Sequence, residues 1–71
     1  MIERYDSMQL YFREMAENSL NFAEEMLEQG RKAKAQEYFT TAMYFAAKVD
    51  SETLGIDLGD KLDQMRRKIF S

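Results

Sequence analysis

Proline is absent from this chain of 71 residues, and its three glycines are the main breaks in a pattern of apolar residues spaced three and four apart. Such spacing places apolar side chains along one face of an α-helix. The pattern therefore predicts an all-α fold. We expect helices at about residues 7–29, 31–49 and 57–70. The whole chain, residues 1–71, is expected to form one small domain: an antiparallel helical hairpin plus a third C-terminal helix, which makes a three-helix bundle.

Local signals place the ends of these helices. Asp6 or Ser7 is the expected N-cap of the first helix, because a short polar side chain can accept a hydrogen bond from the first turn. Gly30 suits the left-handed residue that ends a helix, where a side chain would clash. The stretch 50–59 holds two glycines and several acids. It predicts either a turn or a weak helical start.

The second helix is rich in alanine on its apolar stripe. Small residues let a neighbouring helix approach closely, so aromatic rings of the first helix can fill the space above them. The residues expected to hold the two arms together are Phe22, Ala23, Ala35, Phe39 and Ala42. The third helix adds apolar residues at steps of four, three and four and can lie across the hairpin.

The hairpin resembles a single tetratricopeptide repeat, a two-helix unit of about 34 residues. The residues that carry the resemblance are Phe22, Ala23, Met26, Gly30, Ala35, Phe39 and Ala42, within about residues 16–49. Ser19 departs from the pattern, which usually has a large aromatic residue there. An ordinary helical hairpin meets the same need for close packing, so both interpretations stay open.

The resemblance implies a partner-binding groove on one face of the first helix. The residues of that face are Glu17, Leu20, Asn21, Glu24 and Glu28. A face that mixes acidic and apolar residues favours a basic or amphipathic helical segment of a partner protein. The lysine and asparagine cluster with which related domains hold a terminal carboxylate is absent, so we do not expect that type of ligand.

The dipeptide Tyr-Phe occurs three times, at residues 11–12, 38–39 and 44–45. Adjacent helical residues point about 100° apart, so we expect each Phe to face the core and each Tyr to lie at its boundary, without sharing one site. Tyr11 and Tyr44 are then surplus apolar residues on the surface. They could form a homodimer surface, a partner site or scattered surface residues.

Catalytic chemistry is poorly supported by the composition. The chain has no His and no Cys, the most common general bases, nucleophiles and transition-metal ligands. Glu24 and Glu28 lie one turn apart and could bind a hard cation only weakly. The acids between Asp50 and Asp60 do not fit the spacing of a calcium-binding loop. We expect no enzyme activity, no cofactor and no metal.

The net charge of −3 hides an asymmetry along the chain. Residues 1–30 carry two bases and seven acids, whereas residues 31–49 carry four bases and one acid. The overall acidity disfavours nucleic-acid binding, which needs a basic face. The one compact basic run, residues 66–68, suits the C-terminal end of a helix, where positive charge complements the dipole.

The start of the sequence, residues 1–6, contains two acids and no apolar core, and no run reaches membrane-spanning length. We therefore expect a cytoplasmic protein. The leading hypothesis is a non-enzymatic protein–protein interaction module, such as a small adaptor, chaperone or inhibitor. The alternative is a structural homo-oligomer whose helices complete one another's cores. A third hypothesis is an accessory nucleic-acid or membrane-surface binder that uses the basic run.

Overall fold

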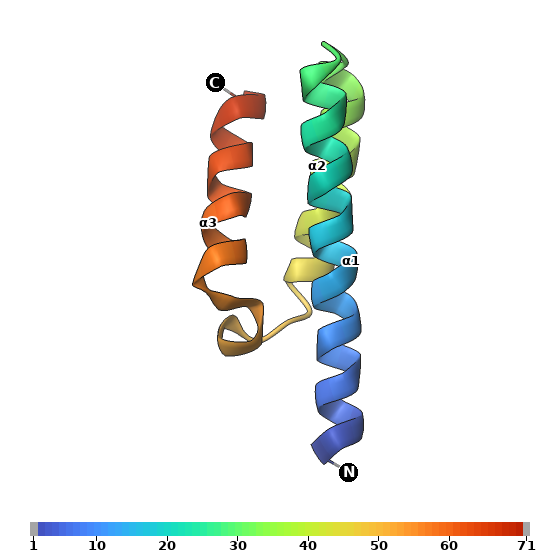
Figure 1. Cartoon of the computed structure of the whole chain (residues 1–71), viewed down its shortest axis with the longest axis vertical. Helices are drawn as coiled ribbons and strands as arrows, with labels where there is room; N and C mark the ends of the chain where they lie inside the picture. Colours follow the sequence, from blue (N-terminus) through green and yellow to red (C-terminus); the bar gives the residue numbers. More distant parts are fainter. Residues whose placement is uncertain (1, 71) are drawn as a thin grey trace.

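The computed structural model describes residues 2–70, with side chains from Met8 onward (Figure 1). The helices are α1 (Ile2–Glu28), α2 (Lys32–Ala46) and α3 (Ser51–Phe70), and residues 2–70 contain no strand. α1 and α2 pack closely as an antiparallel hairpin, and α3 runs beside them with fewer contacts. The predicted all-α three-helix bundle is therefore confirmed.

The start of α1 differs from the prediction, because the helix begins at Ile2 and runs through Asp6 and Ser7. Neither residue caps it. Nothing in residues 2–5 breaks a helix, and the preference of Asp and Ser for caps is only a weak bias within a continuous helical segment. At 1.5 Å per residue, α1 is about 40 Å long and α2 about 22 Å. The N-terminal end of α1 therefore extends beyond the other helices (Figure 1).

Gly30 ends the first arm as predicted. Its φ of 77° is left-handed, and the backbone N–H of Arg31 donates to the carbonyl of Met26 at 2.8 Å across the turn. α2 then begins at Lys32 and ends at Ala46, three residues before the predicted end. Residues 47–49 continue as a turn, in which the N–H groups of Lys48 and Val49 bond to carbonyls three residues back.

Within the stretch 50–59, residues 51–59 are helical with one break. Gly55 has φ 84° and ψ 156°, and this conformation separates a first helical turn at Ser51–Leu54 from the rest of α3. The sequence left this stretch open between turn and helix, and both descriptions apply to part of it. Gly59, the other glycine, lies inside the helix.

Small residues form the centre of the core. Ala16, Ala23, Ala35 and Ala42 are completely buried where α1 and α2 cross. Removing side-chain bulk there lets the two backbones approach, as the sequence indicated. The other core residues come from all three helices, and apart from Ala46 they have larger side chains: Leu20, Phe39, Ala46, Leu58, Leu62, Met65 and Ile69.

Phe22 corrects the predicted core. Its side chain is 50% exposed, and its ring stacks on Tyr38 of α2 with 5.4 Å between the ring centroids. Leu20 occupies the core position instead, with 1% of its surface exposed. α1 carries two neighbouring apolar rows, and the place of α3 decides which of them becomes central.

Polar contacts attach α3 to α1. The Arg13 Nε donates to the Leu54 carbonyl at 3.1 Å, and the Lys61 Nζ donates to the Asn21 Oδ1 at 3.3 Å. Gln9 bonds to Asp50, just before α3 begins. These contacts place α3 along the side of the hairpin that carries Arg13 and Asn21.

Candidate protein-binding face

The predicted groove on α1 lies on the side that α3 covers. Leu20 is buried in the core, so it offers no surface to a partner, which corrects its predicted role. Asn21 is exposed but accepts the hydrogen bond from Lys61 of α3. Glu17 pairs with Arg13 at 3.6 Å on the same helix. The chain's own third helix therefore uses part of the surface that the resemblance assigned to a ligand.

Glu24 and Glu28 complete the predicted groove. Glu24 is half-buried and Glu28 is exposed near the end of α1. Among the described residues, no group of three or more acids is close enough to hold a metal ion. Within this set, Glu28 is the residue most open to a partner.

The α1–α2 hairpin also carries six aromatic residues whose rings form a contacting group of four and a separate stacked pair. We call this set the aromatic face. Its residues are Tyr11, Phe12, Phe22, Tyr38, Tyr44 and Phe45. Half of them come from α1 and half from α2, so the face exists only once the hairpin has formed. None of these ring contacts involves α3, which runs to one side of the hairpin (Figure 1).

Two stacked pairs cross from α1 to α2 within the aromatic face. Phe22 stacks on Tyr38 with an interplanar angle of 29°, and Phe12 stacks on Phe45 at a centroid distance of 6.1 Å and 24°. Both geometries are offset stacks of the kind that aromatic side chains prefer. The pairs also show the relative register of the two helices, because the two rings of each pair lie at about the same height along the hairpin.

Adjacent rings contact one another, contrary to the expectation that they could not share a site. Tyr11 meets Phe12 edge-on at 5.6 Å, and Tyr44 meets Phe45 edge-on at 5.4 Å. The two Cβ atoms of neighbouring residues diverge, but the far edges of long rings still reach each other. The other half of the expectation is confirmed: each Tyr is exposed, and each Phe of the three dipeptides is buried or half-buried.

Lys48 adds a positive charge to one end of the aromatic face. Its Nζ lies 4.8 Å from the centroid of Tyr44 and 5.8 Å from that of Phe12. These distances fit cation–π contacts, which contribute about 0.5–1 kcal/mol at exposed sites.

Much of this face is open to solvent. Tyr11 is 56% exposed and Tyr44 is 59% exposed, as the sequence predicted for both. Phe22, at 50%, is the exposed aromatic residue that the sequence placed in the core. Single exposed apolar residues are common, but contiguous ones on a small domain mark interaction surfaces.

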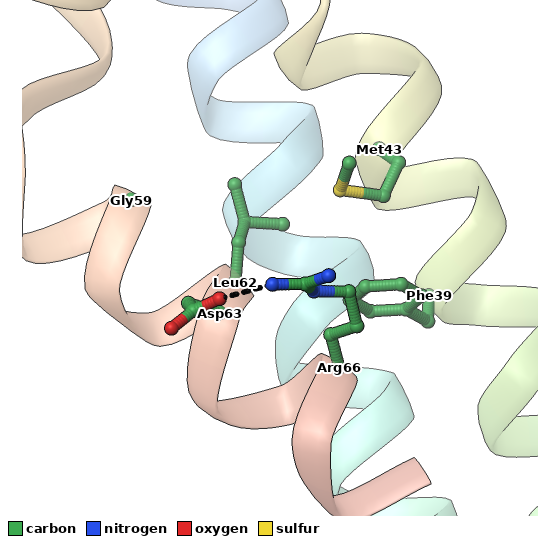
Figure 2. A pocket seen from close by; sticks show the side chains of 6 residues that line it. All are labelled: Phe39, Met43, Gly59, Leu62, Asp63 and Arg66. Carbon is green, nitrogen blue, oxygen red and sulfur yellow. Dashed lines mark hydrogen bonds and ion pairs between the residues drawn. The ribbon is translucent and has the colours of Figure 1, made fainter. Parts of the chain in front are cut away.

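A hollow lies between α2 and α3, and Figure 2 shows it from close by. It has a volume of about 340 Å³ and is open to solvent. Its lining residues are Phe39, Met43, Gly59, Leu62, Asp63 and Arg66. The Arg66 guanidinium donates to the Asp63 Oδ1 at 2.6 Å along one wall. This hollow was not predictable from the sequence, because it depends on how α3 lies against α2.

Asp63 also organises the basic run at the end of α3. Its second oxygen pairs with the Arg67 Nη2 at 3.1 Å. The hydrogen bond from Arg66, together with the charge of Arg67, lowers the pKa of Asp63 below its usual value. Arg66 and Arg67 are therefore both paired with the same acid, which weakens the case for a phosphate-binding patch.

Comparison with protein-family models finds no matching family, and comparisons with curated proteins and with solved structures find no similar chain. The tetratricopeptide resemblance thus stays a prediction that rests on the residues quoted for it. None of the helices in residues 2–70 combines the length and the apolar content needed to cross a bilayer. The geometry of the aromatic face is the main guide to function.

Proposed function

We propose that this protein is a non-enzymatic interaction module that binds another protein through the aromatic face. The observation that carries the proposal is the aromatic face, whose six rings form a group of four and a separate stacked pair across α1 and α2, with none of these ring contacts involving α3. Aromatic residues are enriched at protein interfaces, because they bury a large area at a small cost in side-chain entropy. The proposal includes a cytoplasmic location.

The chemistry of the face suits a helical partner. The rings lie along two antiparallel helices, and the shallow groove between two helices accepts the apolar side of a third. Glu14 and Glu25, exposed on α1, supply negative charge, whereas Lys34 of α2 and Lys48 of the turn after it supply positive charge. A partner with an apolar stripe between a basic and an acidic edge would complement this arrangement.

Photo-crosslinking tests the proposal at single positions. A benzophenone amino acid replaces Tyr44 on the aromatic face, and a matched variant carries it in place of Asp60, an exposed residue of α3. Illumination of living host cells is expected to give a discrete protein adduct from position 44 and none from position 60. Equal adduct patterns from positions 44 and 60 would contradict the proposal. So would the absence of any adduct both from position 44 and from a further variant with the benzophenone at position 11.

A further inference from the structure

We infer that the protein bound by the aromatic face is a second copy of this chain, arranged so that α1 of each copy lies against α2 of its partner. The inference rests on the proposed function and names its partner. It follows from the register of the hairpin, from two stripes of exposed residues and from the charges that they carry.

The two stripes run along the aromatic face, and one of them includes its Tyr11. On α1, Tyr11, Asn18 and Glu25 recur every seven residues and are exposed; Lys34 and Thr41 of α2, with Lys48 of the turn that follows it, have the same spacing and are also exposed. Seven residues are about two helical turns, so the first set forms one line along α1, and the second follows α2 into the turn. Phe22 lies within one turn of Asn18 and Glu25 on α1, and Tyr38 lies within one turn of Lys34 and Thr41 on α2.

The stacked rings give the heights of these residues. Phe22 is level with Tyr38, and Phe12 is level with Phe45, on helices that run in opposite directions. Counting from these pairs puts Glu25 at the height of Lys34, Asn18 at the height of Thr41, and Tyr11 at the height of Lys48. The register follows from the helical rise of 1.5 Å per residue and holds to within about one turn.

A two-fold axis parallel to the helices preserves those heights. Two aromatic faces stacked about such an axis place α1 opposite the partner's α2, running in the opposite direction. Glu25 then faces the partner's Lys34, Asn18 faces the partner's Thr41, and Tyr11 faces the partner's Lys48. Each contact occurs twice, because a two-fold interface is self-complementary. The result is an antiparallel four-helix arrangement around twelve rings, six from each copy.

Charge selects this arrangement over the other face-to-face one. A two-fold axis across the helices would place α1 against the partner's α1. Residues 1–30 carry seven acids and two bases, whereas residues 31–49 carry four bases and one acid. Like-charged helices would then meet, and like charges across an interface are unfavourable. Pairing α1 with the partner's α2 brings opposite charges together. A chain of this size also gains much from burying a second apolar face.

Sedimentation analysis of charge-reversal variants tests the inference. The unmodified chain is expected to dimerise, and Glu25→Lys and Lys34→Glu are each expected to raise the dimer dissociation constant by roughly tenfold. Combining them in one chain restores an opposite pair at both symmetric sites, so the double variant should recover most of the affinity. Asp60→Lys, an equal change of charge on α3, is the control and should leave the dissociation constant unchanged. Circular dichroism checks that every variant folds.

Cysteine crosslinking reports which helices meet. The chain has no cysteine of its own, so Asn18→Cys and Thr41→Cys each introduce a single thiol. A mixture of the two variants should form a disulfide between chains on mild oxidation, whereas each variant alone should not. Dimers linked efficiently by Asn18→Cys alone would place α1 against α1 and overturn the inference.

The outcomes separate this inference from the proposed function. A chain that stays monomeric at about 100 μM overturns the second-copy inference. Its dimer dissociation constant would then exceed about 100 μM, which corresponds to a binding free energy weaker than about −5.5 kcal/mol. Position-specific crosslinks from Tyr44 to a different protein would still support the proposed function in that case. A monomer with no position-specific crosslinks would overturn both.

Discussion

Gln9 and Asp50 exchange two hydrogen bonds although they are 41 positions apart in the sequence. The Gln9 Nε2 donates to the Asp50 Oδ2 at 3.0 Å, and the backbone N–H of Asp50 donates to the Gln9 Oε1 at 3.1 Å. Gln9 is only 5% exposed. One amide side chain of α1 therefore fixes the point from which α3 departs.

Replacing Gln9 by Ala is expected to destabilise the fold by roughly 1–3 kcal/mol, because the Asp50 N–H loses its acceptor in a partly buried place. Urea unfolding followed by circular dichroism measures the change. Gln64→Ala, on the exposed surface of α3, is the control and should alter stability by less than about 0.5 kcal/mol. Equal effects of the two changes would contradict the role assigned to Gln9.

The alanine crossing predicts sensitivity to added volume. Ala42→Leu should cost roughly 1–3 kcal/mol, because the completely buried methyl group of Ala42 leaves no room for a larger side chain beside α1. Ala33→Leu makes the same change at an exposed position of α2 and should be close to neutral. Thermal melts of both variants provide the comparison, and a normal melting temperature for Ala42→Leu would show that the crossing is looser than described.

Replacing the glycines at residues 30 and 59 by alanine is expected to change the stability of the fold in opposite directions. Nothing lies within 4 Å of a Cβ added at either position, so only backbone conformation distinguishes them. Gly30→Ala should cost roughly 1–2 kcal/mol, because its left-handed φ of 77° strains an alanine. Gly59→Ala should stabilise by about 0.4–1 kcal/mol, since Gly59 is helical and alanine has less conformational freedom in the unfolded chain.

Differential scanning calorimetry of the two alanine variants checks this sign. Each variant serves as the control for the other, because the substitution is the same and neither creates a clash. A destabilised Gly59→Ala would mean that helix α3 is strained at that position.

Asp63 predicts a dependence of stability on pH. Its pKa is lowered, first by the hydrogen bond from Arg66 and then by the charge of Arg67. A carboxyl group with a lowered pKa in the folded state contributes stability above its unfolded pKa, near 3.8, and loses that contribution as the pH falls through the folded pKa. The stability difference between the native chain and Asp63→Asn should therefore shrink at acidic pH.

Carboxyl NMR titration gives the pKa of Asp63 directly, and urea unfolding between neutral and acidic pH gives the stability difference. Added salt should raise the pKa towards its usual value, because the pair is exposed and screened. Asp60→Asn, on the same helix, is the control. A stability difference for Asp63→Asn that stays constant as the pH falls would rule out the ion pairs as its cause.

Periodicity was sufficient to predict the helices and most of the stripe on α2. Ala35, Phe39 and Ala42 are buried as expected, because α2 has one apolar stripe and therefore one choice of inward face. α1 has two, and the prediction that Phe22 is buried and Leu20 faces a partner chose the wrong one, because Leu20 is buried and Phe22 is half exposed. The decision depends on α3, whose polar attachments to Arg13 and Asn21 involve residues about 40 positions away.

The candidate site was predictable to a similar degree. Tyr11 and Tyr44 emerged from the Tyr-Phe repeats, since an apolar residue beside a core residue must lie at the edge. The partnership of Phe22 with Tyr38 was not predictable, because stacking across the hairpin depends on the register between helices. That register depends on the turn at Gly30 and on the close packing of the alanines. The order of residues alone does not show which rings these features bring to the same height.

The break at Gly55 separates α3 into two parts that can lose their helical structure independently. Ser51–Leu54 is attached to α1 through Arg13 and the neighbouring Gln9–Asp50 bonds. The rest of α3, which Lys61 joins to Asn21, continues beyond a residue without helical geometry. Helical cooperativity does not pass through such a residue. We expect amide hydrogens of residues 60–70 to exchange with solvent through an opening that leaves the α1–α2 hairpin intact. Transient release of this segment would bare the buried side of α1, so the hairpin would have two accessible faces for part of the time.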